Sequence, residues 1–245
     1  MSSPMTRRTL LGAGAAALLV AACGGGSDAD DEAAMTTTTA ATGSTTGAPS
    51  PTTLTAADFE ALGTCSLLPE STAGPFPLDE QFDRRDITEG YPGHPTRLGL
   101  RVVDEACAPV PGATVEVWHA DASGDYSAFA DGGNGKDEGP GTTFLRGSQT
   151  ASDDGIVEFA TIYPGWYQGR TVHIHVRVHV DGDVVRTGQL YFDETHTAAV
   201  YDEEPYAEFD EPDTTNETDG IEGALLHLTR QGDATLALLN LGVPV

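Results

Sequence analysis

Two histidines in the segment from Val172 to Val180 have the residue type and the spacing of metal ligands. His173 and His175 are separated by one residue in a β-branched run, so on a strand both imidazoles lie side by side on one face. Two neighbouring imidazoles can chelate a single metal ion. The same pattern also occurs in ordinary surface strands, and His179 continues the same parity. A metal site therefore needs further ligands from other parts of the chain.

Residues that could act together with these histidines occur in two loops of the sequence. Tyr167 and Arg170 directly precede it, and Tyr163 in the same loop offers a competing phenol. Tyr126 lies in a glycine-rich segment, Asp121 to Gly141, which is long for a mere connector and is typical of an active-site or binding loop. A phenol, with a pKa of about 10, becomes a ligand at neutral pH only where a strongly Lewis-acidic cation deprotonates it.

Short strands must position these residues, because long helical periodicity is missing from the chain after one short candidate helix, Thr55 to Leu62. A hairpin turn is predicted from Val180 to Val184, through Asp181-Gly182. The fold class predicted is all-β: an antiparallel β-sandwich with long active-site loops. The strands are predicted where alternating or β-branched runs are bounded by Gly, Pro and Asp: Leu98–Val103, Ala113–Trp118, Ile156–Ile162, Val172–Val180, Val184–Phe192, and Leu225–Leu241 with a break at Gly232-Asp233.

Five motifs in chain order combine these residues with others: Leu68-Pro-Glu-x-Thr-x-Gly-Pro-Phe76, Trp118-His-Ala-Asp-Ala-Ser-Gly-Asp-Tyr126, Phe144-Leu-Arg-Gly147, Thr161-Ile-Tyr-Pro-Gly-Trp-Tyr167-x-Gly-Arg170-x-x-His173-Ile-His175 and Gly188-Gln-Leu-Tyr-Phe192. Together they resemble the intradiol ring-cleavage dioxygenases, the family that includes protocatechuate 3,4-dioxygenase and catechol 1,2-dioxygenase. The similarity covers roughly Cys65 to Phe192 and extends more weakly to Asn216 and Asp219.

The resemblance implies a mononuclear, non-haem iron(III), one per chain, held by two tyrosinates and two histidines. Carried over by position, the ligands would be Tyr126, Tyr167, His173 and His175. Hard anionic oxygens and imidazoles suit a ferric ion, whereas copper(I) and structural zinc prefer thiolates. The family's Pro-Gly-x-Tyr pattern selects Tyr167 over Tyr163.

The resemblance also implies a reaction and three further roles. A catechol-type diol would bind the iron and displace the tyrosinate of Tyr167, and O₂ would cleave the ring between the two hydroxylated carbons to give a cis,cis-muconate-type diacid. Arg170 would stabilise charge on the attacked carbon. Trp118 and Gln189 would line the substrate site. From the residues alone, Trp118 is equally a core residue at a strand end and Gln189 a strand hydrogen-bonder.

The beginning of the chain carries an export signal. Arg7-Arg8 precede an apolar run, Leu11 to Val20, that is too short to span a membrane. Val20-Ala21-Ala22-Cys23 resembles a lipobox, so residues 1–23 are expected to be a twin-arginine lipoprotein signal with lipidation at Cys23. A plain cleaved signal is the alternative. Residues 24–53 have the composition of a disordered linker, and residues 54–245 form the expected domain. The protein is expected outside the bacterial cytoplasmic membrane.

Charge and cysteine content restrict the partners. With 38 acidic and 12 basic residues, a formal charge of −26 excludes nucleic acid, and Lys136 is the single lysine. Membrane contact is expected only through the lipid anchor, and the oligomeric state stays open. Outside the cytoplasm, Cys65 and Cys107 favour a disulfide, with two buried thiols as the alternative.

Two other functions compete with a dioxygenase that acts on a catechol-type diol and O₂. One is a metal-free β-sandwich binding protein that keeps only the fold. The other is a hydrolase with zinc at the histidine pair. Tyr126 and Tyr167 discriminate between them, because zinc hydrolysis does not need the two phenols and ferric chemistry does.

Overall fold

The computed structural model describes residues 53–63, 65–135 and 139–245. The expected signal peptide with Cys23, the expected linker up to residue 52, and Lys136 lie outside the described residues. The described chain consists mainly of strands, joined by α1 (Ala56–Glu60), α2 (Glu194–Tyr201) and the 3₁₀ helix η1 (Tyr206–Glu208). None of these described helices has the length and apolar character needed to cross a membrane.

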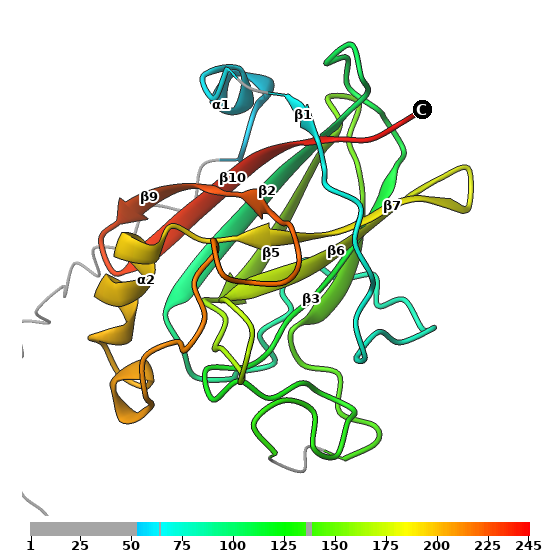
Figure 1. The fold of residues 1–245 in the computed structure, drawn as a ribbon. Helices are drawn as coiled ribbons and strands as arrows, with labels where there is room; N and C mark the ends of the chain where they lie inside the picture. The colour runs from blue at the N-terminus through cyan, green and yellow to red at the C-terminus, as the bar shows by residue number, and fades with distance from the viewer. Residues whose placement is uncertain (1–52, 64, 136–138) are drawn as a thin grey trace, which may run out of the picture. The chain divides into compact units, whose positions relative to one another are not determined.

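The strands form two five-stranded sheets (Figure 1). The first sheet has the order β1-β10-β2-β5, with β9 also paired to β10: β1 (Ser66–Leu67), β10 (Ala234–Gly242), β2 (Pro95–Val103), β5 (Ile156–Ile162) and β9 (His227–Gln231). The second sheet has the order β4-β3-β6-β7-β8: β4 (Arg146–Thr150), β3 (Thr114–Trp118), β6 (His173–Val180), β7 (Asp183–Tyr191) and β8 (Ala224–Leu225).

One hydrophobic core joins the two sheets, because alternate residues of the central strands are apolar and point inward. Its fully buried members include Leu98 and Leu100 of β2 and Ile174 and Val176 of β6. The residues that alternate with Ile174 and Val176 on β6 include His173 and His175. Their side chains therefore point to the outer face of the second sheet. The all-β prediction is confirmed, and every predicted strand run contains an observed strand.

The expectation of antiparallel pairing is wrong for the last strand. β10 runs parallel to β2, from Thr235 opposite Thr96 to Gly242 opposite Val103. The chain reaches β10 only after it has built the second sheet, so β10 is not connected to β2 by a hairpin. The two-residue strands β1 and β8 also pair in parallel. Residue alternation reports which face is buried, but it does not report strand direction.

The longest elements that were not expected from the sequence are β4 and α2. Strand β4, with the sequence Arg-Gly-Ser-Gln-Thr, has no apolar alternation and is held by its pairing with β3. Helix α2 has buried residues at Thr197, Val200 and Tyr201, but its short sequence mixes polar and apolar residues. It begins where the Asp193 side chain accepts a hydrogen bond from the backbone N–H of His196 at 3.0 Å.

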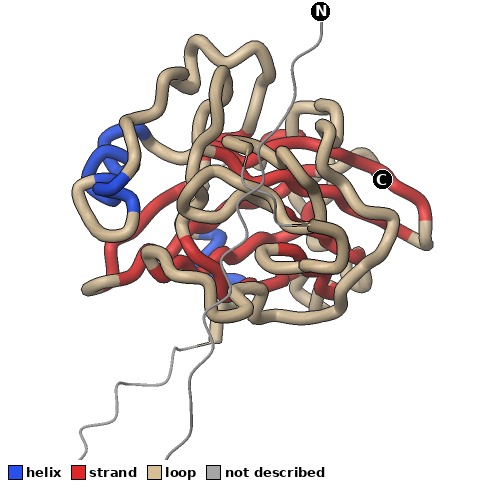
Figure 2. Tube along the Cα trace, turned by 90° about the horizontal axis from the view of Figure 1, so that it is seen from below, coloured by secondary structure: helices blue, strands red, loops and turns tan. Residues whose placement is uncertain are grey.

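Three of the predicted site residues lie in loops: Tyr126 between β3 and β4, and Tyr167 and Arg170 between β5 and β6. The connection between β3 and β4 gathers below the strands in Figure 1 and on the near side of Figure 2. At the other end of β6, the predicted hairpin turn is confirmed: Asp181 and Gly182 have φ of 53° and 91°. Positive φ at both residues is the geometry of a type I′ turn, which favours glycine at the second position.

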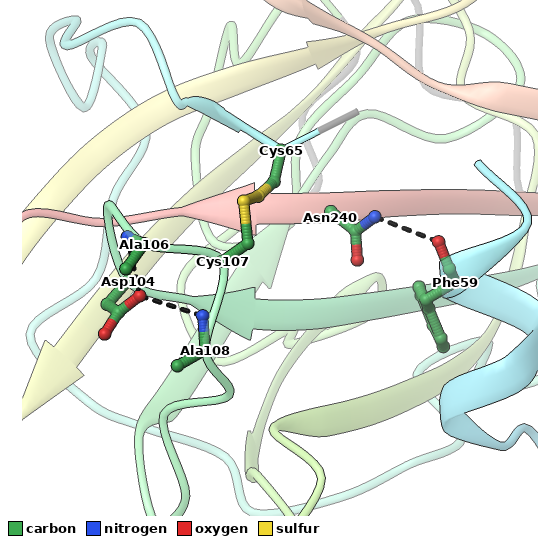
Figure 3. Close-up of a disulfide and its surroundings, with 7 residues drawn as sticks. All are labelled: Phe59, Cys65, Asp104, Ala106, Cys107, Ala108 and Asn240. Carbon is green, nitrogen blue, oxygen red and sulfur yellow. Dashed lines mark hydrogen bonds between the residues drawn. A yellow bond between two sulfur atoms is a disulfide. The ribbon is translucent and has the colours of Figure 1, made fainter. Parts of the chain in front are cut away.

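A disulfide joins Cys65 to Cys107, with Cα atoms 5.9 Å apart and a sequence separation of 42 (Figure 3). It connects the segment before β1 to the turn between β2 and β3. That turn is organised by Asp104, whose Oδ1 accepts hydrogen bonds from two backbone N–H groups. The disulfide therefore lies near the beginning of β3, whereas the predicted site residue Trp118 lies at the end of that strand.

Candidate metal centre

The two predicted histidine ligands lie side by side on β6 and are buried. His173 is 3% exposed and His175 is not exposed, and their Nε2 atoms are 3.2 Å apart. His173 Nδ1 lies 2.7 Å from the backbone oxygen of Thr171, so Nδ1 carries the proton and the Nε2 lone pair faces the cluster. Both imidazoles can therefore offer nitrogen to one ion.

The first predicted tyrosine ligand reaches this pair from the loop after β3. Tyr126 is fully buried, and its Oη lies 3.3 Å from His173 Nε2. The loop is fixed at this point because the backbone N–H of Tyr126 donates to the oxygen of Gly132 at 2.7 Å. The glycine-rich sequence allows this return, since a Cβ at Gly132 would lie 2.9 Å from that of Phe129.

The second predicted tyrosine comes from the loop between β5 and β6. The Tyr167 ring meets the Tyr126 ring at 5.7 Å and the His173 ring at 5.6 Å, both at steep angles. Arg170 Nη1 donates to Tyr167 Oη at 3.3 Å. The structure thus brings together all four predicted ligands and the predicted catalytic arginine. Tyr163 points elsewhere, because its Oη pairs with Thr197 Oγ1 on α2 at 2.8 Å.

The protonation states of these groups fit a strongly charged metal ion. Burial, reinforced by the charge of Arg170, lowers the pKa of His173 to about 3, and burial also lowers the pKa of His175 well below its usual range. Both imidazoles are therefore neutral and available as ligands at pH 7. Burial raises the pKa of Tyr126 and that of Tyr167. Only a strong Lewis acid would convert such buried phenols into phenolates.

The donor set requires the tyrosines. Among the described residues, no group of three or more His, Cys, Asp or Glu side chains is placed to hold a metal ion. At this cluster the four converging donors are two imidazole nitrogens and two phenol oxygens. Hard oxygen ligands with imidazole suit a ferric ion better than the thiolate sites of zinc or copper(I), so the residues present fit the iron that the sequence resemblance implies.

Trp118 and Gln189 flank His175 in one row across the second sheet. Trp118 on β3 and Gln189 on β7 are both register partners of His175. The Trp118 ring stacks parallel to the His175 ring at 5.0 Å, and Arg170 Nη2 donates to Gln189 Oε1. Trp118 Nε1 and Gln189 Nε2 are buried and have no hydrogen-bond partner among the described residues. These two donors are free to meet a bound molecule.

A segment from the N-terminal part of the domain covers the cluster. The Phe76 ring stacks on Tyr126 at 4.6 Å and meets Tyr167 edge-on at 6.1 Å. Gly74, with φ of 72°, lies so close that an added Cβ would be 3.0 Å from Cε1 of His175. Glycine is required there both for the backbone conformation and for the close approach. This cover removes the centre from bulk water.

Arg146 belongs to a motif quoted for the resemblance, but no role was predicted for it. This β4 side chain is 4% exposed, and its three nitrogens donate to Ser127 Oγ, Ser127 O and Phe76 O at 2.7, 2.9 and 2.8 Å. It therefore ties the residue after Tyr126 to the residue that covers it. Burial lowers the pKa of Arg146 to about 10, so it stays charged at pH 7. The sequence could have indicated a role for Arg146, because it is an arginine within a quoted motif in a chain with few basic residues.

The remaining histidines lie outside the cluster. His119 is buried between Ala120 O and Thr161 Oγ1, both at 2.7 Å. His94 bonds to Glu203 and Thr235, and His196 shares that Thr235 hydroxyl. His179, beyond a register shift in β6, lies 3.6 Å from Glu116. His227 is exposed. These positions are those of structural or surface residues.

Comparison with known proteins shows the family of the chain. A family model described as Dioxygenase matches residues 73–203, more than half of the chain. The structure of an intradiol ring-cleavage dioxygenase from Tetranychus urticae is 36% identical, with a TM-score of 0.68 over 74% of this chain and 95% of that one. The dioxygenase domain of a carbohydrate-binding fusion protein from Streptomyces sp. SirexAA-E is 27% identical, with a TM-score of 0.56 over 74% and 99%.

Chlorocatechol 1,2-dioxygenase from Rhodococcus opacus is 31% identical over 121 residues, which are 42% of this chain and 45% of that protein. The chain matches less than half of the length of this protein, and the same holds for three further curated dioxygenases that it resembles. With the family model and the structural relatives, these matches show that the chain belongs to the intradiol ring-cleavage dioxygenases, a family of oxidoreductases.

Proposed function

We propose that the protein is a ferric dioxygenase that uses O₂ to cleave the ring of a catechol-type diol between its two hydroxylated carbons, giving a cis,cis-muconate-type diacid. One observation carries the proposal: Tyr126, Tyr167, His173 and His175 converge from three segments of the chain, with Arg170 bonded to Tyr167. Family membership and the names of the relatives support the same reaction class.

Iron held by these four residues would bind the diol through its oxygens and draw electron density from the ring, which makes a ring carbon reactive toward O₂. Held as a phenolate in the iron-loaded protein, Tyr167 Oη would take the proton of an entering diol hydroxyl, and the resulting neutral phenol could then move aside. It is the less enclosed tyrosine, and Arg170 already donates to it at 3.3 Å.

Three other groups orient the substrate. Arg170 offers a permanent positive charge on a rigid fork, which would stabilise charge on the ring carbon that O₂ attacks. The unpartnered Nε2 of Gln189 and Nε1 of Trp118 are donors aimed into a buried region. Phe76, stacked on Tyr126, excludes water, which strengthens each of these electrostatic contacts.

Replacing each tyrosine with phenylalanine tests this proposal. Tyr126→Phe and Tyr167→Phe each remove one phenolate ligand, so we expect ring cleavage by the iron-loaded protein to fall at least about 100-fold. The visible tyrosinate-to-iron absorption band, which should shift when catechol is added to the parent protein, should weaken in both variants. Diacid formation is followed in the ultraviolet.

Tyr163→Phe is the matched control, because Tyr163 lies in the same loop but bonds to α2. It should keep both the band and the activity. A parent protein that stays colourless with iron and binds no catechol would refute the ferric dioxygenase. A zinc-loaded protein with hydrolytic activity that survives both tyrosine replacements would establish the zinc hydrolase instead.

A further inference from the structure

A loop beyond the family match encloses the segment that carries Tyr167 and Arg170. We call residues 210–221, between η1 and β8, the clamp loop; the matched residues end at 203. The oxygen of Asp210 accepts a hydrogen bond from Trp166 Nε1 at 2.8 Å. Asp213 Oδ1 accepts one from the backbone N–H of Gly169 at 3.0 Å. The clamp loop thus holds the residues on both sides of Tyr167.

The strongest attachment is made by Asp219, whose side chain is completely buried. Its Oδ2 accepts from Arg170 Nε at 3.0 Å and from the backbone N–H of Thr171 at 2.8 Å. Its Oδ1 accepts from the backbone N–H of Ile221 at 2.9 Å. Asn216 adds a bond from Thr171 Oγ1 at 2.7 Å. A buried carboxylate with this many donors is held in a single orientation.

This contact decides where the charge of Arg170 points. A guanidinium is a rigid planar fork, so fixing its Nε edge fixes the direction of both terminal nitrogens. With Nε on Asp219, Nη1 meets Tyr167 Oη and Nη2 meets Gln189 Oε1. Without Asp219, the arginine side chain would keep its charge but could rotate away from both groups.

We propose that Asp219 is a positioning residue that, together with the clamp loop, aims Arg170 at Tyr167 and at the reacting diol. The inference rests on the proposed function for its catalytic consequence, but the mechanical attachment stands without it. Asp219 touches neither the metal ligands nor the expected substrate position, and it acts through Arg170.

The first test is Asp219→Asn in the iron-loaded protein. The amide would keep the shape but place a donor against Arg170 or Thr171, so kcat for ring cleavage should fall roughly 10- to 100-fold. KM, bound iron and the visible tyrosinate band should change little. Glu217→Gln is the matched control, since Glu217 is an exposed carboxylate on the same loop with no hydrogen bond recorded for its side chain among the described residues. It should behave like the parent.

A double-mutant cycle separates positioning from general destabilisation. In an Arg170→Met background, Asp219→Asn should cause no further loss of kcat, because the group on which it acts is already absent. An equal loss in both backgrounds would overturn the proposal and give Asp219 a purely structural role. Unchanged kcat in the single variant would overturn it as well.

Amide hydrogen exchange in the metal-free protein gives a readout that does not depend on activity. Asp219→Asn should accelerate exchange at Thr171 about tenfold, and the exposed variant Asp213→Asn should do the same at Gly169. If the parent protein proves inactive, the dioxygenase proposal fails while these rates still decide the attachment. If Asp219→Asn does not fold, Asp213→Asn still tests the clamp loop. Parent-like exchange at Gly169 would refute it.

Discussion

At the level of single residues, burial decides which groups can act. The two imidazoles of the centre are held neutral and the two phenols are held protonated, so the metal-free cluster carries no charge of its own. The charges of Arg170 and Arg146 oppose the rise in the pKa of Tyr126, whereas the charge of Asp219, the ion-pair partner of Arg170, adds to the rise in the pKa of Tyr167. Such a site favours a bound species that brings in, or creates, negative charge.

His119 gives a pH dependence of stability. Burial lowers its pKa to about 4 in the folded protein, whereas an unfolded histidine titrates near 6.5. Between these values the unfolded chain binds the additional proton, so the free energy of unfolding falls as the pH falls from about 6.5 to 4. The loss attributable to His119 should reach about 3 kcal/mol. Denaturant unfolding of the metal-free protein at pH 7 and pH 4.5 measures it.

His119→Gln removes this titration while keeping a polar side chain. Its stability should therefore depend less on pH over the same interval than that of the parent, by about 2 to 3 kcal/mol. Replacement of the exposed His227 by Gln is the control and should leave the pH dependence as it was. Identical pH profiles for the parent and His119→Gln would contradict the assignment.

At the level of elements, residue alternation predicted the strands that position the site. In the run His-Ile-His-Val on β6, the alternation alone predicts that His173 and His175 share one face, and the burial of Ile174 and Val176 in the core makes it the outer face. The turn at Asp181-Gly182 followed from glycine chemistry in the same way. These features are local, so a short stretch of sequence contains the information.

Features that depend on distant segments could not be predicted from such patterns. The contact of Asp219 with Arg170 joins residues 49 positions apart, and no spacing rule connects them. Two of the three Arg146 bonds go to the backbone of Ser127 and Phe76, which any residue types could supply, and only the bond to the Ser127 hydroxyl depends on the side chain. The direction of β10 likewise depends on the path of the whole chain. The convergence of the two tyrosines was expected only through the family resemblance.

The disulfide connects two separate segments of the fold, so its loss should lower stability but leave iron binding and catalysis at the metal centre unchanged. Closing a 42-residue separation restricts the unfolded chain by about 4 kcal/mol. Cys65→Ser with Cys107→Ser should lower the free energy of unfolding by roughly 2 to 4 kcal/mol, measured in denaturant. Because the bond lies near the beginning of β3 and the cluster near its end, kcat at 25 °C should persist. Lost iron binding in the folded double variant would contradict this separation.

At the level of the whole molecule, the protein has a formal charge of −26, but the charged side chains next to the predicted metal ligands include two arginines. The few basic residues near the cluster, Arg146 and Arg170, are partly or almost fully buried within an otherwise acidic protein. An acidic surface of this kind disfavours binding to nucleic acid, whereas the two arginines, one of them paired with Asp219, bring positive charge to the cluster. Such an exterior would also disfavour rebinding of the dicarboxylate product of the proposed reaction.

We propose further that the protein is anchored outside the cytoplasmic membrane through a lipid on Cys23, with residues 24–53 as a tether. Cys23→Ala in the producing cells should move the protein from the membrane fraction to the soluble fraction and abolish incorporation of a labelled fatty acid. Cys65→Ser serves as the control for a cysteine outside the signal. A soluble, unlabelled parent protein would show that the signal is cleaved without lipidation.

The parallel pairing of β10 has a consequence for how the molecule is made. β10 lies between β2 and β1, so the first sheet has a vacant central position until residues 234–242 have left the ribosome. Until then the edge of β2 that pairs with β10 has no partner, so the first sheet cannot be completed earlier. The twin-arginine route that we propose for this chain carries folded proteins, so on that proposal export would have to follow the pairing of β10 with β2.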